Sequence, residues 1–155
     1  MENNLKVKKL FSRFSRDEVD KIIPQFGGDT NKSFKVTLLN RQTYFLKTSS
    51  SHQDSFFKEA KGLQKIREIG HLKVPSIYYF DENILILEYI QFGKKKKGSS
   101  FNLGKGLAHL HSHTNLYFGL EYDNYIGKNI QKNTPQLRHS HHSWGEFYYH
   151  YRIKV

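Results

Sequence analysis

The chain has 155 residues, which is enough for one domain with a buried core. It contains no cysteine, which excludes a disulfide scaffold and thiolate metal sites and suits a reducing cytoplasm. The formal net charge of +11 predicts attraction to polyanions such as nucleotides, nucleic acid or anionic membranes, and composition does not choose among them. No segment approaches about 18 uninterrupted apolar residues, so we expect no membrane span.

Four segments with regular patterns follow one another in the first half of the chain. The capping-box spacing at residues 15–18 predicts a short helix that ends near Pro24. Residues 33–39 and 42–48 alternate apolar and polar side chains, which predicts two strands joined by a turn. Residues 51–69 are amphipathic and are followed by a glycine, which predicts a helix with a glycine at its end.

The second half predicts a hairpin, a linker and two helices. Residues 77–80 and 84–89 are apolar runs on either side of a turn, and residues 94–100 form a basic linker. Residues 102–113 show helical spacing, and a last aromatic helix begins at Trp144 after a long loop. The leucines expected to face a core are Leu103, Leu107 and Leu110. Together these elements predict an α+β fold with an antiparallel sheet.

One lysine and one glutamate are predicted to meet. Side chains alternate along a strand, so Lys47 shares a face with Phe45. On the next helix Glu59 falls inside the apolar stripe, where an unpaired carboxylate is costly. Lys47 is the obvious cation for it. Taken alone, a glutamate at the edge of the stripe that reaches water beside an unrelated lysine also fits this pattern.

Two further stretches are weak signals when taken alone. Gly27 and Gly28 precede the first long strand and let a backbone approach phosphates, but two glycines often make only a turn. Residues 86–90 end the last predicted strand, where the C=O of Glu88 and the N–H of Ile90 are in position to read the edge of an adenine base. An ordinary buried strand end explains the same residues.

Histidines and lysines form two groups without a specific pattern. The histidines lack cysteine or suitably spaced carboxylate partners, so we expect surface histidines and no metal site. The run 94–97 is four lysines, which fits a solvated loop and also fits a small basic module that binds nucleic acid. The histidines concerned are His109, His111, His113, His139, His141 and His142.

The order of the motifs resembles the fructosamine kinase (ketosamine kinase) family, which is related to the aminoglycoside and choline kinases. No single stretch is specific, but together they cover nearly the whole chain in the family's order. The most specific one includes Phe118-Gly119, Asp123 to Gly127, and Gln131 with Asn133. The others are Gly27 to Asn31, Tyr44 to Lys47, Glu59 to Leu63, Val74-Pro75, Leu87 to Tyr89, Leu103 to His111, and Trp144 to Arg152.

The resemblance implies a protein-kinase-like small lobe over residues 1–92 and the first helices of a large lobe over residues 93–155. It implies ATP-dependent phosphorylation of the sugar of a ketosamine, a glycated lysine, in protein deglycation. In a kinase the lysine–glutamate pair holds the ammonium against the ATP phosphates. The residues implied on the nucleotide side are Gly27, Gly28, Asn31, Lys47, Glu59, Glu88, Tyr89 and Ile90. Those implied near the acceptor are Asp123, Asn124, Tyr125 and Gly127.

The family's catalytic Asp and Mg²⁺ ligands follow the last matching helix, and no His-Gly-Asp or His-Arg-Asp motif precedes Val155. We therefore expect no catalytic residue and no metal ligand among these residues, and an incomplete or inactive fragment from a shortened gene, a frameshift or a partial chain. A cytoplasmic protein that binds neither membrane nor nucleic acid is expected. We also expect association through Trp144, Phe147 and Tyr148, which lack the helices on which they should pack.

Overall fold

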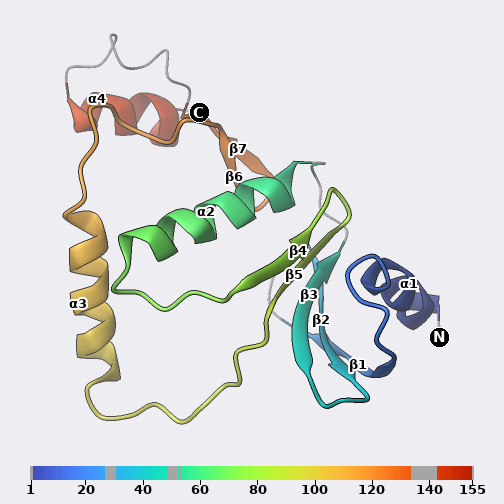
Figure 1. The fold of residues 1–155 in the computed structure, drawn as a ribbon. Helices are drawn as coiled ribbons and strands as arrows, with labels where there is room; N and C mark the ends of the chain where they lie inside the picture. The colour runs from blue at the N-terminus through green and yellow to red at the C-terminus, as the bar shows by residue number, and fades with distance from the viewer. Residues whose placement is uncertain (1, 27–30, 49–51, 53, 134–142, 155) are drawn as a thin grey trace.

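An antiparallel sheet of five strands, in the order β1-β2-β3-β5-β4, forms the centre of the molecule (Figure 1). The computed structural model describes residues 2–26, 31–48, 52, 54–133 and 143–154. The strands are β1 (Val19–Gln25), β2 (Lys32–Leu38), β3 (Thr43–Thr48), β4 (Ile77–Phe80) and β5 (Ile84–Glu88). The helices are α1 (Glu2–Phe11), α2 (Ser55–Ile69), α3 (Ser99–His111) and α4 (Trp144–Tyr148), which continues as the π-helical turn η2 (Tyr149–Ile153). None of the described helices is both long enough and apolar enough to cross a membrane.

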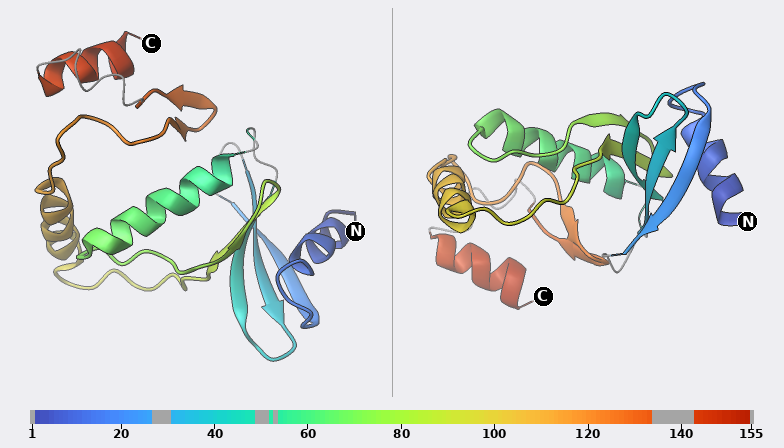
Figure 2. Two further views of the ribbon diagram at one scale, coloured as in Figure 1. Left: turned by 45° about the horizontal axis from the view of Figure 1, so that its top comes forward. Right: turned by 90° about the horizontal axis from the view of Figure 1, so that it is seen from below.

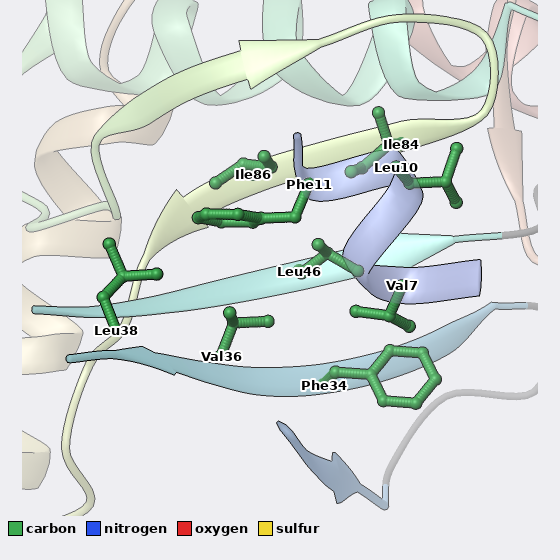
Figure 3. Packing of buried hydrophobic residues seen from close by; sticks show 9 residues of the cluster. All are labelled: Val7, Leu10, Phe11, Phe34, Val36, Leu38, Leu46, Ile84 and Ile86. Carbon is green, nitrogen blue, oxygen red and sulfur yellow. The ribbon is translucent and has the colours of Figure 1, made fainter. Parts of the chain in front are cut away.

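Helix α1 covers one face of the sheet and builds the larger of two hydrophobic cores (Figure 3). The alternation predicted for residues 33–39 and 42–48 is confirmed, because every second side chain of β2 from Phe34 to Leu38 enters this core, and from β3 Leu46 enters it while Tyr44 packs against it. The helix itself was not predicted, although its apolar side chains have helical spacing. The core consists of Val7, Leu10, Phe11, Phe34, Val36, Leu38, Leu46, Ile84 and Ile86.

The helix predicted between residue 15 and Pro24 is wrong, because this segment forms the edge strand β1. The Ser15 hydroxyl accepts a hydrogen bond from the backbone N–H of Asp17 at 3.0 Å, which closes a turn and does not cap a helix. Pro24 is tolerated because an edge strand does not need every backbone N–H for pairing. It lies opposite Phe34 in the antiparallel register with β2.

Helix α2 connects β3 to β4 and covers the opposite face of the sheet, as the pattern of residues 51–69 predicted. Its apolar stripe buries Phe56 and Ala60 against Leu85 and Leu87 of β5. The helix ends at Gly70, whose φ of 79° is in the left-handed region that favours glycine. The hairpin of β4 and β5 also has the predicted antiparallel pairing.

Helices α3 and α4, which follow β5 in the chain, lie apart from the sheet, and α1 and α3 are at opposite ends of the molecule (Figure 2). The leucines predicted to face a core on α3 are not buried, since Leu103 is 55% exposed and Leu107 is 38% exposed. On the last helix Phe147 is buried, whereas Trp144 and Tyr148 are exposed. The prediction that these leucines face a core is therefore wrong for Leu103 and Leu107, whereas the exposure of Trp144 and Tyr148 agrees with the expected lack of packing partners.

A short hairpin interrupts the segment that was predicted to be mostly loop. Its strands are β6 (Asn124–Ile126) and β7 (Asn129–Gln131), and two residues join them. Gly127 begins this turn with a φ of 60°, as tight hairpin turns require. The glycine between two short β-prone runs was a sequence signal for this hairpin. Its position beside α2 is important for the site described next.

Candidate functional site

The predicted contact between Lys47 and Glu59 is present. The Lys47 ammonium donates to both carboxylate oxygens of Glu59, at 2.8 Å to Oε1 and 2.7 Å to Oε2. Lys47 projects from β3, where it pairs in register with Leu85, and Glu59 lies one turn into α2. The two side chains are 20% and 34% exposed, so the pair is partly shielded and still reaches a cavity. Of the two alternatives, the structure thus has the paired glutamate.

A cavity of about 400 Å³ lies beside this pair. It brings together residues that are far apart in the sequence, from the position just before β2, from β3, from α2 and from the β6–β7 hairpin. Four predicted site residues besides Lys47 and Glu59 line it, namely Asn31, Asn124, Tyr125 and Gly127. The lining residues are Asn31, Lys47, Ser55, Lys58, Glu59, Gly62, Leu63, Ile66, Asn124, Tyr125 and Gly127.

Tyr125 connects the hairpin to α2 at the edge of this cavity. Its hydroxyl donates to Asp54 Oδ1 at 2.6 Å and accepts from the Lys58 ammonium at 3.3 Å. Lys58 also pairs with Asp54 Oδ2 at 2.7 Å. The hydrogen bond from Lys58, followed by the one from Tyr125, lowers the pKa of Asp54, and the bond to Asp54 raises the pKa of the Tyr125 phenol. Neither Lys58 nor Asp54 was among the predicted site residues.

Asp123 and Asn124 both accept hydrogen bonds from Asn133, a buried residue to which the sequence analysis assigned no role. Asn133 is only 2% exposed, and its backbone N–H donates to Asp123 Oδ1 at 2.6 Å. Its side-chain amide donates to Asn124 Oδ1 at 2.8 Å and accepts from Arg152. Gly119 passes close by, because a Cβ there would lie 3.1 Å from Asn133 Oδ1. The network fixes the shape of the hairpin that lines the cavity.

The predicted hinge residues line a second, mostly apolar cavity of about 340 Å³. Phe45, Leu87, Tyr89 and Ile90 are on its wall, so it opens on the same face of β3 as Lys47. The Glu88 side chain accepts a hydrogen bond from the backbone N–H of Ser76 at 3.0 Å, and this bond lowers the pKa of Glu88. The other residues of the wall are Gln25, Pro75, Glu88 and Phe92.

Gly27 and Gly28 lie outside the described residues, so the predicted glycine turn cannot be added to this geometry. Among the residues that are described, no three histidine or acidic side chains converge as a metal site. The Glu59 carboxylate at the 400 Å³ cavity is hydrogen-bonded to Lys47 through both oxygens. These side chains do not fit a Mg²⁺ ion, which prefers several oxygen ligands, and we derive no step through a metal.

The strand order of the sheet, and the position of α2 between β3 and β4 in the chain, agree with known structures. The crystal structure of a candidate fructosamine-3-kinase from Thermobifida fusca matches with a TM-score of 0.78 and 24% identity, over 95% of this chain and 51% of that chain. A similar protein from Haemophilus somnus also gives a TM-score of 0.78, at 22% identity, and half of that chain is covered. These matches define the fold class as α+β, with the small lobe of a kinase-like protein.

Sequence comparison identifies the family. A model of the family described as "Fructosamine kinase" matches residues 4–155, and the chain belongs to this family. The "Probable ketoamine kinase" of Enterococcus faecium is 32% identical over 139 residues, which are 86% of this chain and 46% of that protein. The "Protein-ribulosamine 3-kinase, chloroplastic" of Arabidopsis thaliana is 34% identical over 114 residues, 68% of this chain and 33% of that protein. The chain thus spans a third to a half of these relatives, and the predicted resemblance is confirmed.

Proposed function

We propose that this chain forms the nucleotide-binding part of a ketosamine kinase and that Lys47 binds the phosphates of ATP. The observation that carries this proposal is the Lys47–Glu59 pair at the wall of the 400 Å³ cavity. A lysine ammonium has three N–H donors, and Glu59 accepts two of them. The glutamate thereby aims the ammonium so that its third donor can reach a phosphate oxygen. A charge-assisted bond of this kind is among the stronger hydrogen bonds in proteins.

The adenine base belongs in the apolar cavity at the hinge. Phe45 and Lys47 are two residues apart on one face of β3, which places them roughly 7 Å apart along the strand. A nucleotide lying along β3 would therefore have its base against Phe45 and Leu87 and its phosphates at Lys47. In this pose the backbone of Glu88 and Ile90 would meet the edge of the base, and Asn31 would lie near the phosphates.

The acceptor proposed for the whole kinase is the sugar of a glycated lysine, held near the β6–β7 hairpin. The names of the relatives, which are ketoamine and ribulosamine kinases, support this substrate class. Asp123, Asn124, Tyr125 and Gly127 are the proposed acceptor-side residues. We place the boundary between small and large lobes at residues 92 and 93, and we attribute the Mg²⁺ that accompanies ATP to ligands other than the described residues.

We also propose that these 155 residues bind ATP without transferring its phosphoryl group. Phosphoryl transfer needs a group that orients the acceptor hydroxyl, and the sequence has no His-Gly-Asp or His-Arg-Asp motif to supply it. Incubation with ATP and a fructosyl-lysine peptide should yield no phosphorylated sugar. Turnover that persists after removal of host kinases would contradict this part of the proposal.

Calorimetric titration with ATP, adenosine and a single-stranded oligonucleotide tests the proposal against a basic module that binds nucleic acid. The proposal expects ATP to bind more tightly than adenosine and to retain most of its affinity when the salt concentration rises. A variant with alanine at residues 94–97, which are exposed, should bind ATP like the parent. If instead the oligonucleotide binds, and both salt and the 94–97 variant abolish binding, the basic-module function replaces the kinase proposal.

A further inference from the structure

Two consecutive residues of α2 hold two different parts of the molecule. Glu59 binds Lys47 of the sheet, and Lys58 binds Tyr125 of the β6–β7 hairpin. The helix therefore links the sheet to a hairpin that comes about 65 residues later in the chain. This hairpin lies beside the first turns of α2 (Figure 1). Both contacts border the same cavity, since all four side chains line it. A shift of the hairpin would be transmitted through one helical turn to the carboxylate that orients Lys47.

The contact at Tyr125 involves both its hydroxyl and its ring. The hydroxyl lies 2.6 Å from Asp54 Oδ1 and 3.3 Å from Lys58 Nζ. The same ammonium lies 4.4 Å from the centre of the Tyr125 ring. The His52 ring stacks on the Tyr125 ring with their centres 4.2 Å apart and an interplanar angle of 4°. His52 Nε2 is also 3.1 Å from the backbone oxygen of Lys128 in the hairpin turn. Several independent contacts thus join the start of α2 to the hairpin.

Asp54 shows that this connection replaces an ordinary helix cap. Asp54 is the N-cap residue of α2, a position where an aspartate usually accepts a hydrogen bond from a backbone N–H of the first turn. Its side chain makes no such bond here. Its two carboxylate oxygens instead bind Tyr125 and Lys58. Asp54 therefore binds the distant hairpin and does not cap its own helix. A residue with a purely local role in α2 would not need this contact.

We infer that Tyr125 is a positioning residue that holds α2 so that Glu59 stays on Lys47, and that the acceptor-side hairpin is thereby coupled to phosphate binding. This inference rests on the proposed function, because it concerns the same cavity. Tyr125 acts through Asp54 and Lys58 on the helix, and it does not itself contact the phosphates. Ordering of the hairpin by an acceptor would favour the oriented lysine, and loss of the Tyr125 hydroxyl would weaken it.

A double-mutant cycle in the full chain tests this coupling with ATP as the probe. Tyr125→Phe keeps the ring and removes the hydroxyl, and it should weaken ATP binding about three- to tenfold, the range of one hydrogen bond. It should leave adenosine binding unchanged. In a Glu59→Gln background the same substitution should have no further effect, because the positioned carboxylate is gone. Additive effects, or no effect of Tyr125→Phe on ATP, would overturn the inference while the proposed function stands.

Two matched controls accompany the cycle. Tyr78→Phe changes a tyrosine whose ring packs with Phe14 and Tyr44 at the opposite face of the sheet, and it should bind ATP like the parent. Lys58→Met should resemble Tyr125→Phe, whereas Lys61→Met should not, because the Lys61 ammonium lies over Phe57. Equal losses for Lys58→Met and Lys61→Met would indicate a general charge effect and would refute the connection.

Hydrogen exchange of α2 without nucleotide gives a second readout that does not depend on ATP binding. Tyr125→Phe should raise amide exchange in the first turns of α2 several-fold, and Tyr78→Phe should leave it unchanged. If the parent fails to bind ATP, the proposed function fails, and this measurement still decides whether the hairpin holds the helix. Unchanged exchange in Tyr125→Phe would overturn the inference whatever the ATP result.

Discussion

Replacing Lys47 by alanine should remove the phosphate-dependent part of ATP binding. The ammonium makes a charge-assisted contact from a side chain that is 20% exposed, for which we expect a loss of about 1.5–3 kcal/mol. This loss corresponds to a Kd for ATP that rises roughly 10- to 150-fold. Adenosine has no phosphates, so its Kd should be nearly the same for the parent and the variant. Isothermal titration calorimetry with both ligands measures the difference directly.

Glu59→Gln should have a smaller effect than Lys47→Ala. The glutamine leaves the ammonium in place but removes the charge that orients it through the contacts at 2.8 and 2.7 Å. Lys65→Ala is the control, because Lys65 is an exposed lysine of the same helix. Thermal unfolding of each variant shows whether the fold is kept. Lys47→Ala should keep it, because Glu59 is partly exposed and its carboxylate can be hydrated by water when Lys47 is removed. Unchanged ATP affinity in a folded Lys47→Ala protein, with measurable binding by the parent, would refute the phosphate assignment.

Three further predictions concern stability and association. Phe11→Ala should lower the free energy of unfolding by about 3–5 kcal/mol in chemical denaturation, because Phe11 is buried between α1 and the sheet, and a loss below 1 kcal/mol would contradict that packing. Burial raises the pKa of Asp81, but hydrogen bonds from the Asn83 backbone N–H and from Arg13 lower this pKa more. The ionised Asp81 carboxylate therefore stabilises the fold above pH about 4, and this contribution disappears as the pH falls through the lowered pKa. Asp81→Asn should therefore destabilise the protein at pH 7 and have little effect in strong acid, and an equal loss at both pH values would disagree with this reasoning. The exposed aromatic surface around Trp144 should bind a hydrophobic dye and promote association in light scattering, and a monomer without dye binding would argue against it.

The Lys47–Glu59 pair was predictable because local periodicity determines the direction in which each of the two side chains points. Alternation along β3 puts Lys47 on the α2 face, and the 3.6-residue period of α2 puts Glu59 in the inward stripe. The strand β5 could be predicted for a similar reason, since it is a short apolar run with a defined end. Only the pairing of β3 with β5 showed that the end of β5, the proposed hinge, lies next to the strand that carries Lys47.

Local signals failed where they competed with contacts from elsewhere in the chain. The capping-box spacing at residues 15–18 predicted a helix, but pairing with β2 makes the following residues a strand. The leucine spacing of α3 was correct for a helix, yet spacing does not show whether another element covers Leu103 and Leu107. A periodic pattern identifies the apolar side of an element, and the rest of the fold decides whether that side is buried.

The sequence by itself determined the family, the α+β class, the main sheet and the lysine–glutamate pair, because these depend on short-range patterns in a fixed order. The tertiary structure alone decided that α1 closes the outer face of the sheet and that Tyr125 meets Asp54 across 71 positions of the chain. It also showed that Asp54 binds the hairpin and does not cap its own helix. No local pattern encodes such contacts, because they depend on where distant elements lie once the chain has folded.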